Sequence, residues 1–476
     1  MSTDTRAVEE WMRIDLRALA RTGTVHFMGV GGAGMSTIAE LLVKSGGHVS
    51  GCDRDLGNAA IALKAHGVTL MMGHDAAHVA DAAALVITSA VAQDHPEVVT
   101  ARELGIPVLK RAQALGSIVN QGRVIAISGT HGKTTTTAMT SAALMEAGLD
   151  PTGFVGGRVE AWGGGLQVGE SSLFVVEADE YDRSFFTLRP HVAVVTSIEA
   201  DHLDIYGDLA GLEDAFELFL DSVPESGRVI ACVDDAGVQR VISRFSDARI
   251  LRYGTGAAAD MRAVDIRQDG DGMMYTVVQG ADVLGEVKLR VPGVHNVLNS
   301  LAAIAAARSM GAAFEDAARG IAGYQGVARR FERVGIAGDV LFVDDYAHHP
   351  TEIEATLSAA RSALADRRIV AVFQPHLYSR TRDLAQEFGT ALAQADTVWV
   401  TDVYAARELP MDGITGETVA TAARTAGAKN VTYVADLAEL ETTLGNALQP
   451  GDACIAMGAG DINEAIRRVY SRRLAA

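Results

Sequence analysis

The most chemically specific stretch of this sequence is a glycine turn that holds one lysine and a run of threonines, Gly129-Thr130-His131-Gly132-Lys133-Thr134-Thr135. It follows an apolar run at residues 124–127, which predicts a buried strand, and precedes residues 136–148, whose pattern predicts a helix that ends at a glycine. Backbone N–H groups and the helix dipole hold phosphate oxygens at such a junction. Lys133 would lie near the outer phosphates and the Thr134 hydroxyl could bind Mg²⁺, so the stretch predicts a site for ATP or GTP.

One position departs from the full phosphate-loop pattern, which has a glycine where this chain has Ile127. The alternative is a glycine turn whose lysine only faces the solvent. Two features favour phosphate binding. Gly132-Lys133-Thr134 after an apolar strand is a specific combination, and a threonine run at a helix start lacks a packing reason.

Two acidic clusters follow later apolar runs and could bind a metal ion. Residues 177–180 are Glu-Ala-Asp-Glu, and residues 199–204 are Glu-Ala-Asp-His-Leu-Asp. A carboxylate such as Glu177 at the carboxyl end of a parallel strand lies where such sheets bind ligands, and can hold Mg²⁺ beside phosphates. His202 is less expected because Mg²⁺ prefers oxygen, and its alternative is a capping or core residue.

Two further stretches could contact the nucleotide. His295, Asn296 and Asn299 precede a predicted alanine-rich helix, which they could cap, or they could equally hydrogen-bond a base. Arg329 and Arg330 belong to a basic cluster in an acidic chain, which fits phosphate recognition; the alternative is a solvated face.

A second glycine-rich turn lies near the N-terminus, at Gly29-Val30-Gly31-Gly32-Ala33-Gly34. It separates a predicted strand from a helix that is predicted from Met35, and the next strand ends at Asp53. This is the context of a dinucleotide fingerprint, in which glycines let the backbone approach a diphosphate and a carboxylate reaches a ribose hydroxyl. The pattern leaves open which diphosphate binds, and a plain tight turn is the alternative.

Three later strands, predicted at residues 340–343, 369–373 and 397–400, end in polar segments. The side chains after them that could do chemistry include Asp345, Tyr346, His348, His376 and Arg380. Since a doubly wound sheet binds ligands at the carboxyl ends of its strands, we expect a third α/β domain that faces the nucleotide. Thr351 and Glu354 predict a capping box for the helix that follows the first of these strands.

The composition sets further limits. At about 150 residues per domain, 476 residues predict three domains, at 1–118, 119–326 and 327–476. The formal charge of −19 argues against nucleic acid or an anionic membrane as the partner. Isolated cysteines without metal spacing, no signal-peptide pattern and no long apolar stretch predict a cytoplasmic protein that does not span a membrane.

The predicted fold class is therefore α/β with three domains. We expect an N-terminal Rossmann-like domain that binds a diphosphate, a central P-loop ATPase-type domain and a C-terminal doubly wound domain.

The motifs together resemble those of the Mur ligases, the ATP-dependent amide-forming enzymes of peptidoglycan precursor synthesis. The matching stretches lie in all three predicted domains in the family's order, at residues 129–135, 177–180, 199–202, 295–299 and 344–352. Within the family, residues 29–36 and 374–382 resemble the branch that joins L-alanine to UDP-N-acetylmuramate.

The resemblance assigns ligand-binding roles to individual residues. It implies that the UDP-sugar binds at Gly29, Gly31, Gly32, Gly34, Met35, Ser36, Asp53 and Ser89. It implies that ATP binds at Gly129, Thr130, His131, Gly132, Lys133, Thr134, Thr135, His295, Asn296, Asn299, Arg329, Arg330 and Asp345. One Mg²⁺ is implied at Thr134 and Glu177 and a second at Glu177 and His202, with Mn²⁺ able to substitute.

The resemblance also implies the catalytic and amino-acid-binding residues. Catalysis is implied at Lys133, His348, His376 and Arg380. L-Alanine binding is implied at Tyr346, His348, His376 and Arg380. Most members carry a carbamylated lysine near the metals, and the absence of a lysine in the stretch directly after Glu199 agrees with the L-alanine branch. Leu377 stands where many members have arginine, a departure that concerns the amino-acid pocket.

The implied reaction is a ligation through an acyl phosphate. The lactyl carboxylate would attack the γ-phosphate of ATP, the amine of L-alanine would then displace phosphate, and His348 or His376 would take the proton. The implied partners are these small molecules, and the protein is expected to be a monomer or a weak homodimer. The alternatives are a murein-recycling ligase that attaches a tripeptide, folylpolyglutamate synthetase, an NAD-dependent oxidoreductase and an inactive nucleotide sensor.

Overall fold

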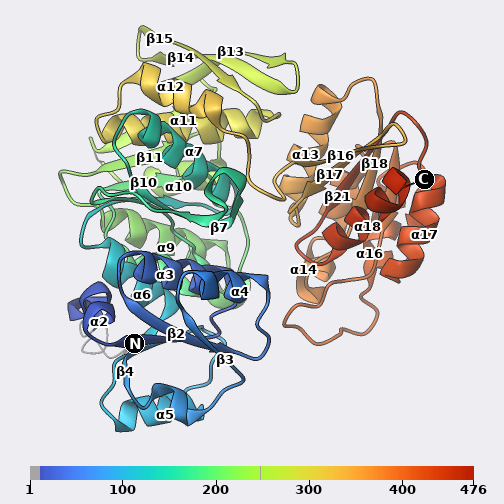
Figure 1. Cartoon of the computed structure of the whole chain (residues 1–476). Helices are drawn as coiled ribbons and strands as arrows, with labels where there is room; N and C mark the ends of the chain where they lie inside the picture. The colour runs from blue at the N-terminus through green and yellow to red at the C-terminus, as the bar shows by residue number, and fades with distance from the viewer. Residues whose placement is uncertain (1–10, 247, 476) are drawn as a thin grey trace. The chain divides into compact units, whose positions relative to one another are not determined.

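Three β-sheets organise the chain, and parallel strands predominate in them (Figure 1). The computed structural model describes residues 11–246 and 248–475. By its internal contacts the chain divides into two compact units. The first comprises Met1–Arg262, Val278–Asp282 and Asn299–Ile321, and the second comprises Ala263–Val277, Val283–Leu298 and Ala322–Ala476.

The first sheet is parallel, with the strand order β3-β2-β1-β4-β5 that is typical of a Rossmann-like domain. Its strands are β1 (Thr24–Met28), β2 (His48–Asp53), β3 (Thr69–Met72), β4 (Ala82–Ile87) and β5 (Val108–Lys110). Its helices are η1 (Trp11–Arg13), α2 (Leu16–Thr22), α3 (Ala33–Lys44), α4 (Asn58–Ala65), η2 (Ala76–Val79), α5 (Pro96–Glu103) and α6 (Arg111–Val119). The last four residues of β1 are buried, as expected for a strand covered on both faces.

In the first unit the second sheet has the order β12-β11-β10-β6-β9-β7-β8. Its strands are β6 (Arg123–Ser128), β7 (Thr152–Val159), β8 (Gly164–Gln167), β9 (Leu173–Glu177), β10 (Val192–Val195), β11 (Arg228–Cys232) and β12 (Ile250–Gly254). The connecting helices are α7 (Lys133–Glu146), η3 (Glu160–Trp162), η4 (Tyr181–Thr187), α8 (Leu203–Tyr206), α9 (Leu209–Asp221) and α10 (Ala236–Ile242). The chain continues through β13 (Met261–Asp269), β14 (Gly272–Gln279), β15 (Asp282–Leu289), α11 (Val294–Ser309) and α12 (Phe314–Gly323).

The third sheet lies in the second unit and has the order β16-β17-β21-β18-β19-β20. Its strands are β16 (Glu332–Ala337), β17 (Val340–Asp345), β18 (Arg368–Phe373), β19 (Thr397–Val400), β20 (Val431–Tyr433) and β21 (Asp452–Met457), and only β16 runs antiparallel to its neighbour. Its helices are α13 (Pro350–Ala363), α14 (Tyr378–Asp383), α15 (Ala385–Leu392), α16 (Gly416–Thr425), α17 (Leu437–Ala447) and α18 (Ile462–Ala475).

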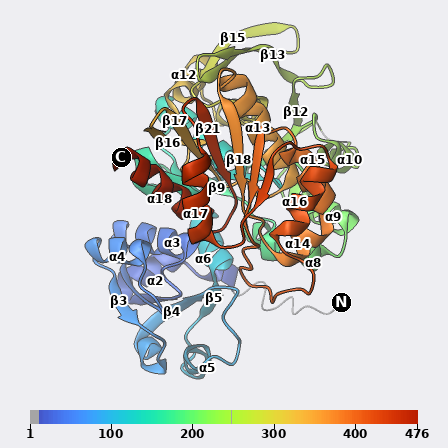
Figure 2. The ribbon, with the colours of Figure 1, turned by 90° about the vertical axis from the view of Figure 1, so that its right-hand side faces the viewer.

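This third domain is doubly wound, as predicted. Alternate residues of β17 enter two separate cores, Val343 with the residues of α13, α15 and α16, and Phe342 with those of α17 and α18. Figure 2 shows α15 and α16 on one side of the sheet and α17 and α18 on the other. The three sheets confirm the predicted fold class.

Some predicted helix starts are wrong. Helix α7 begins at Lys133 and not at Thr136. Helix α11 begins at Val294, so His295, Asn296 and Asn299 lie inside this helix and not before it. The capping box of α13 uses His349 and Glu352 in place of Thr351 and Glu354, because Pro350 takes the first helical position. No helix among the described residues is both long and apolar enough to cross a membrane.

The contact between α15 and α16 gives a stability prediction with a matched control. A Cβ at Gly389 in α15 would lie 2.4 Å from the main-chain carbonyl carbon of Ala422, whereas one at Gly445 in α17 would meet nothing closer than Val469 Cγ1 at 3.8 Å. Both changes to alanine raise helix propensity by about 1 kcal/mol. We expect Gly389→Ala to lower the free energy of unfolding by about 1–3 kcal/mol through overpacking, and Gly445→Ala to leave it unchanged or higher. Urea unfolding measures both, and equal effects would contradict the packing account.

Candidate active site

The predicted phosphate loop joins the end of β6 to the first residue of α7. Gly132 is the N-cap of α7 with a φ of +81°, and Gly129 has a φ of +133°, a region that favours glycine. A Cβ at Gly129 would lie 2.1 Å from Thr196 Oγ1, and one at Gly132 would lie 2.5 Å from Asn299 Oδ1. Glycine is therefore required at both positions, and the loop leads into the helix end whose dipole attracts anions.

The Lys133 ammonium group is largely buried and surrounded by oxygen. Its Nζ donates to the two carboxylate oxygens of Glu180 at 2.8 and 2.9 Å and to the carbonyl oxygen of Gly129 at 2.7 Å. Burial acts to lower the pKa of Lys133, but the charges of Glu180 and Asp179 outweigh it and hold the pKa above its usual value. Lys133 is therefore a permanent cation at the start of α7, which is the charge that phosphate binding requires.

The threonine run of α7 has a packing role, so the prediction that it lacked one is wrong. Thr136 and Thr137 are fully buried on a helix that contacts β7 and β9. Thr136 Oγ1 donates to Asn299 Oδ1 at 3.2 Å, and Thr140 Oγ1 donates to the Thr136 carbonyl oxygen at 2.7 Å. Short side chains let the helix lie close to the sheet while their hydroxyls find partners nearby.

The neighbours of β6 in the sheet, β9 and β10, both lead into predicted metal ligands. Glu177 ends β9, and its Oε1 accepts the N–H of Gly156 at 2.7 Å. The Thr134 hydroxyl hydrogen-bonds to the same carboxylate, and burial raises the pKa of Glu177 despite these two hydrogen bonds. The structure thus brings Thr134 and Glu177 together as an oxygen pair of the type that Mg²⁺ prefers.

His202 follows β10 and caps the short helix α8 in a left-handed conformation, with a φ of +53°. Its Nε2 lies 3.8 Å from Asp201 Oδ2, and its ring meets the ring of Tyr181 edge-on with centroids 5.2 Å apart. In the described part of the chain, Glu177 and His202 do not share a group of three or more Asp, Glu, His or Cys ligand atoms that all lie within 4.8 Å of one another. The second metal position stays a prediction.

The N-terminal glycine turn closes on the carboxylate that was predicted to bind a ribose. Gly29 has a φ of +81°, and the Gly31 N–H donates to Asp53 Oδ2 at 2.9 Å. A Cβ at Gly31 would lie 3.0 Å from the same oxygen, and Gly32 caps α3. The turn therefore has the backbone approach and the helix N-terminus that a diphosphate needs.

The other predicted UDP-sugar residues have varied surroundings in the structure. Met35 is a core residue with 1% exposure, and Ser36 Oγ donates to the Ala33 carbonyl oxygen at 3.0 Å. Ser89 Oγ donates to Asp182 Oδ2, and a Cβ at Gly34 would touch the Arg111 side chain at 3.0 Å. Met35 can therefore contribute only its backbone to a ligand, whereas Ser89 lies at a polar contact with the middle domain.

In the second unit, the side chains predicted to act on the amino acid form an aromatic row. The ring centroid of His348 lies 5.1 Å from that of Tyr346 and 5.6 Å from that of His376, which stacks on Tyr404 at 5.9 Å. Arg380 Nη1 lies 3.5 Å from His376 Nδ1, and the Arg380 residue is buried. β17 and β18 thus bring all four predicted catalytic or amino-acid residues of this domain together.

The residue before α14, Leu377, is buried and has a φ of +68°. A left-handed φ is unfavourable for leucine and is found where the surrounding structure enforces it. Its N–H donates to the Tyr404 carbonyl oxygen at 3.0 Å, and its own carbonyl accepts the Thr381 N–H at 3.1 Å. The side chain at this departure from the family pattern is therefore packed inward.

Three predicted nucleotide residues of the second unit lie around the end of β17 and the residue that follows it, Tyr346. The guanidinium groups of Arg329 and Arg330 lie 4.9 and 5.1 Å from the ring centroid of Tyr346. Asp345 accepts backbone N–H groups from Phe331 and Ala347 at 2.7 and 2.8 Å, and burial raises its pKa to about 6.

The two remaining nucleotide residues of this unit lie in the first turn of α11. Burial, followed by the charge of Arg330, lowers the pKa of His295 to about 4, so its ring is neutral at pH 7. Asn296 Nδ2 donates to the Pro292 carbonyl oxygen at 2.7 Å. The predicted ATP residues are therefore divided between the two units, with Asn299 on the first.

Comparison with known proteins identifies the family. Three family models match in order: "Mur ligase family, catalytic domain" at residues 24–123, "Mur ligase middle domain" at 127–307 and "Mur ligase, glutamate ligase domain" at 329–460. The UDP-N-acetylmuramate--L-alanine ligase of Salinibacter ruber is 44% identical over 446 residues, which cover 94% of each chain. The chain belongs to the Mur ligase family.

Solved structures of Mur ligases agree. The UDP-N-acetylmuramate-alanine ligase MurC of Thermotoga maritima aligns with a TM-score of 0.80 and 29% identity, and the match covers 95% of this chain and 99% of that one. A murein peptide ligase from Psychrobacter arcticus aligns with a TM-score of 0.69 and 25% identity over the same shares.

Three acidic residues of this Mur ligase were not assigned a role from the sequence. Glu180 binds Lys133, Asp182 binds Ser89, and Glu352 Oε2 accepts the N–H of His348 at 2.9 Å. Glu180 and Glu352 belong to motifs that the sequence analysis singled out, so the signal was present. Asp182 had no such signal, because its partner lies in another domain.

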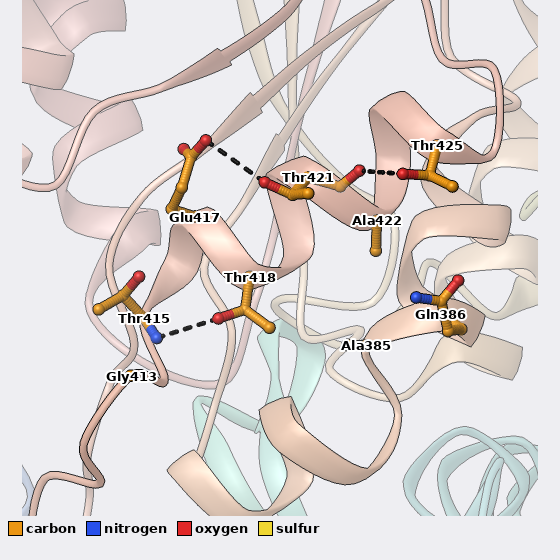
Figure 3. Close-up of a pocket in the computed structure, with 9 residues that line it drawn as sticks. All are labelled: Ala385, Gln386, Gly413, Thr415, Glu417, Thr418, Thr421, Ala422 and Thr425. Carbon is orange, nitrogen blue, oxygen red and sulfur yellow. Dashed lines mark hydrogen bonds between the residues drawn. The ribbon is translucent and has the colours of Figure 1, made fainter.

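A pocket of about 400 Å³ between α15 and α16 is unrelated to these residues (Figure 3). Its lining includes Gln386, Thr415, Glu417 and Thr421. The Thr415 N–H donates a hydrogen bond to Thr418 Oγ1 at 3.2 Å, which is drawn in Figure 3. No predicted site residue lines it. The predicted site residues therefore follow the strand ends and do not lie in this hollow.

The charge of His376 gives a direct test of the site's electrostatics. Burial, followed by the charges of His348 and Arg380, lowers the pKa of His376 to about 4 from 6.5. We expect its imidazole NMR signal to titrate near pH 4, and Arg380→Gln to raise that midpoint. Between pH 4 and 6.5, the unfolded chain binds more protons at this residue than the folded chain does. The contribution of His376 to the free energy of unfolding therefore falls as the pH drops from 6.5 to 4.

Arg382→Gln is the matched control for this titration. Arg382 lies two residues further along the same helix, and its Nε donates to Asp383 at 2.6 Å. The midpoint of His376 should not move in this variant. A midpoint near 6.5 in the unchanged protein would contradict the proposed burial of the ring.

Proposed function

We propose that this chain joins the lactyl carboxylate of UDP-N-acetylmuramate to L-alanine, with ATP converted to ADP and phosphate. The observation that carries the proposal is the 44% identity, over 94% of both chains, to a UDP-N-acetylmuramate--L-alanine ligase. The phosphate loop at Lys133 fits the ATP requirement, and the N-terminal glycine turn fits the diphosphate of the sugar nucleotide.

In the first proposed step, the lactyl carboxylate attacks the γ-phosphorus of ATP, and an acyl phosphate and ADP form. A phosphoryl transfer of this kind depends mainly on positioning and on neutralising charge. Lys133 supplies a fixed positive charge at the start of α7, and Glu180 and the Gly129 carbonyl keep its ammonium group oriented. The helix dipole adds to the attraction for phosphate.

Thr134 and Glu177 would hold Mg²⁺, because they are hydrogen-bonded to each other and offer only oxygen. When bound, the ion neutralises phosphate charge. We keep His202 as a proposed ligand of a second ion, with Mn²⁺ as a substitute.

In the second proposed step, the amine of L-alanine attacks the acyl phosphate, and phosphate leaves. His348 Nδ1 lies 2.9 Å from the Tyr346 carbonyl oxygen, so this nitrogen carries the ring proton and Nε2 is the basic one. Glu352 Oε2 lies 3.2 Å from the same Nδ1 and helps to hold the ring in this tautomer and orientation. We therefore assign the base to His348 and not to His376, whose pKa of about 4 makes it weakly basic.

The remaining assignments are also part of this proposal. Arg380 would bind the carboxylate of L-alanine, and the residues of the N-terminal turn would bind UDP, with domain limits at 118 and 326. A cytoplasmic location and a monomer or weak homodimer complete the proposal. The murein-recycling, folylpolyglutamate, oxidoreductase and sensor alternatives are not favoured.

The proposed activity can be tested by phosphate release from ATP and Mg²⁺ in the presence of UDP-N-acetylmuramate. L-Alanine, glycine, L-serine and the tripeptide are compared, each with a control that lacks the sugar nucleotide. We expect release only with the sugar nucleotide and L-alanine, and a product heavier by one alanine residue. Release only with the tripeptide would assign the chain to the recycling branch.

The role of the lysine is tested by Lys133→Ala. Because a charge that stabilises the transferred phosphoryl group is removed, we expect kcat to fall by about 10²-fold or more. Lys288→Ala is the control, since Lys288 is exposed and its Nζ pairs with Asp269 at 2.7 Å on the surface. Turnover like that of the unchanged protein in Lys133→Ala would overturn the phosphate-loop assignment.

A further inference from the structure

Four potential metal ligands from four elements converge in the N-terminal domain, outside every residue assigned above. They are His26 in β1, Cys52 in β2, His78 in η2 and Glu97 in α5, and their ligand atoms all lie within 4.8 Å of one another. His26, Cys52 and Glu97 are completely buried, and the His78 side chain is 15% exposed. The sequence shows no metal spacing around Cys52, because these ligands are far apart along the chain.

Three of the ligand atoms are separated by distances close to the edges of a zinc tetrahedron. His26 Nε2 lies 3.4 Å from Cys52 Sγ and 3.7 Å from Glu97 Oε2, and Cys52 Sγ lies 3.5 Å from that oxygen. His78 Nδ1 faces the other oxygen of the same carboxylate, Oε1, at 3.6 Å. Tetrahedral zinc, with bonds of about 2.1 Å to nitrogen and oxygen and about 2.3 Å to sulfur, separates its ligands by about 3.4–3.6 Å.

Hydrogen bonds from and to Cys52 Sγ explain part of this arrangement, but they do not explain the position of His78. The two nitrogen-to-oxygen separations, 3.6 and 3.7 Å, exceed the range of about 2.7–3.2 Å for such bonds. His78 Nδ1 is buried and has no hydrogen-bond partner among the described residues. A buried polar atom in this position indicates a missing partner.

The outer contacts of the group orient the ligand atoms inward. His26 Nδ1 lies 2.8 Å from Ser50 Oγ, which accounts for that nitrogen and leaves Nε2 facing Cys52. Glu97 Oε1 accepts the Asp75 N–H at 2.9 Å. Contacts of this kind fix the tautomer and the ring orientation of metal-bound histidine and hold metal-bound carboxylates.

We propose that His26, Cys52, His78 and Glu97 bind one zinc ion at a structural site. The mixture of thiolate, imidazole and carboxylate suits zinc, and four protein ligands leave no open position for a substrate. As the Zn–S bond forms, the Cys52 thiol releases its proton to the solvent, and each imidazole donates a nitrogen lone pair. No electrons are transferred.

The ion would fasten η2 and α5 to one face of the first sheet. The apolar core on this face is small, with Met28, Val79, Leu85 and Val98 among its buried residues. A fifth side chain, His74, borders the group, with Nδ1 3.3 Å from Cys52 Sγ, and we place it as a hydrogen-bond partner of the thiolate.

The test is the metal content of the full-length protein, expressed with zinc, freed of any histidine tag and dialysed without chelator. We expect about one zinc per chain by mass spectrometry, and less than about 0.1 in Cys52→Ala and His78→Ala. Cys454→Ala and His66→Ala are the matched controls and should keep the ion, since Cys454 is buried in the third domain and His66 is exposed. Absence of zinc from the unchanged protein, or full retention in Cys52→Ala, would overturn the proposal.

A second measurement does not depend on how the variants fold. Crystals of the unchanged protein, measured at the zinc absorption edge, should show an anomalous peak about 2.3 Å from Cys52 Sγ. Removal of the ion by a chelator should lower the melting temperature of the unchanged protein. The absence of a peak at this position would refute the site.

Discussion

A buried ammonium group has to be surrounded by oxygen, and the middle domain is arranged around that requirement at Lys133. Glycines at 129 and 132 bend the chain so that the Lys133 side chain lies beside the Gly129 carbonyl, and Glu180 supplies the opposite charge. The cost of burying one charge without the other is several kcal/mol, so loop and acidic segment depend on each other.

The topology of the sheets explains why the predicted site residues follow strands. Parallel strands end at one edge of a sheet, and β9 and β10 flank β6, so both acidic segments arrive beside the phosphate loop without long connections. In the third domain β17 and β18 deliver His348 and His376 in the same way. The apolar strands stabilise the domains, and the polar residues that follow them are placed where they can contact a ligand.

The sequence was sufficient for the parts of this structure that depend on local patterns. Continuous apolar runs identified β6, β9, β17 and β18, because strands covered on both faces need such runs. Helix starts were less predictable, since the N-cap of α7 is Gly132, which has no side chain to form a capping hydrogen bond.

Contacts between residues far apart in the sequence were predicted only where family motifs paired them, as for Thr134 and Glu177. Ser89 and Asp182 are 93 residues apart, and the four ligands of the proposed zinc site come from separate elements. Such contacts follow from the assembled fold. No spacing along the chain encodes them.

Two residues of the candidate site, His202 and Leu377, hold backbone conformations that cost of order 1–3 kcal/mol each. Glycine would adopt a positive φ without strain at either position, but the balance differs between them. The buried Leu377 side chain would leave a cavity that costs more than the strain it relieves, whereas the partly exposed His202 would lose little packing. Selection of this enzyme for heat resistance alone would therefore keep Leu377 and act against His202, so screens should score activity and stability together.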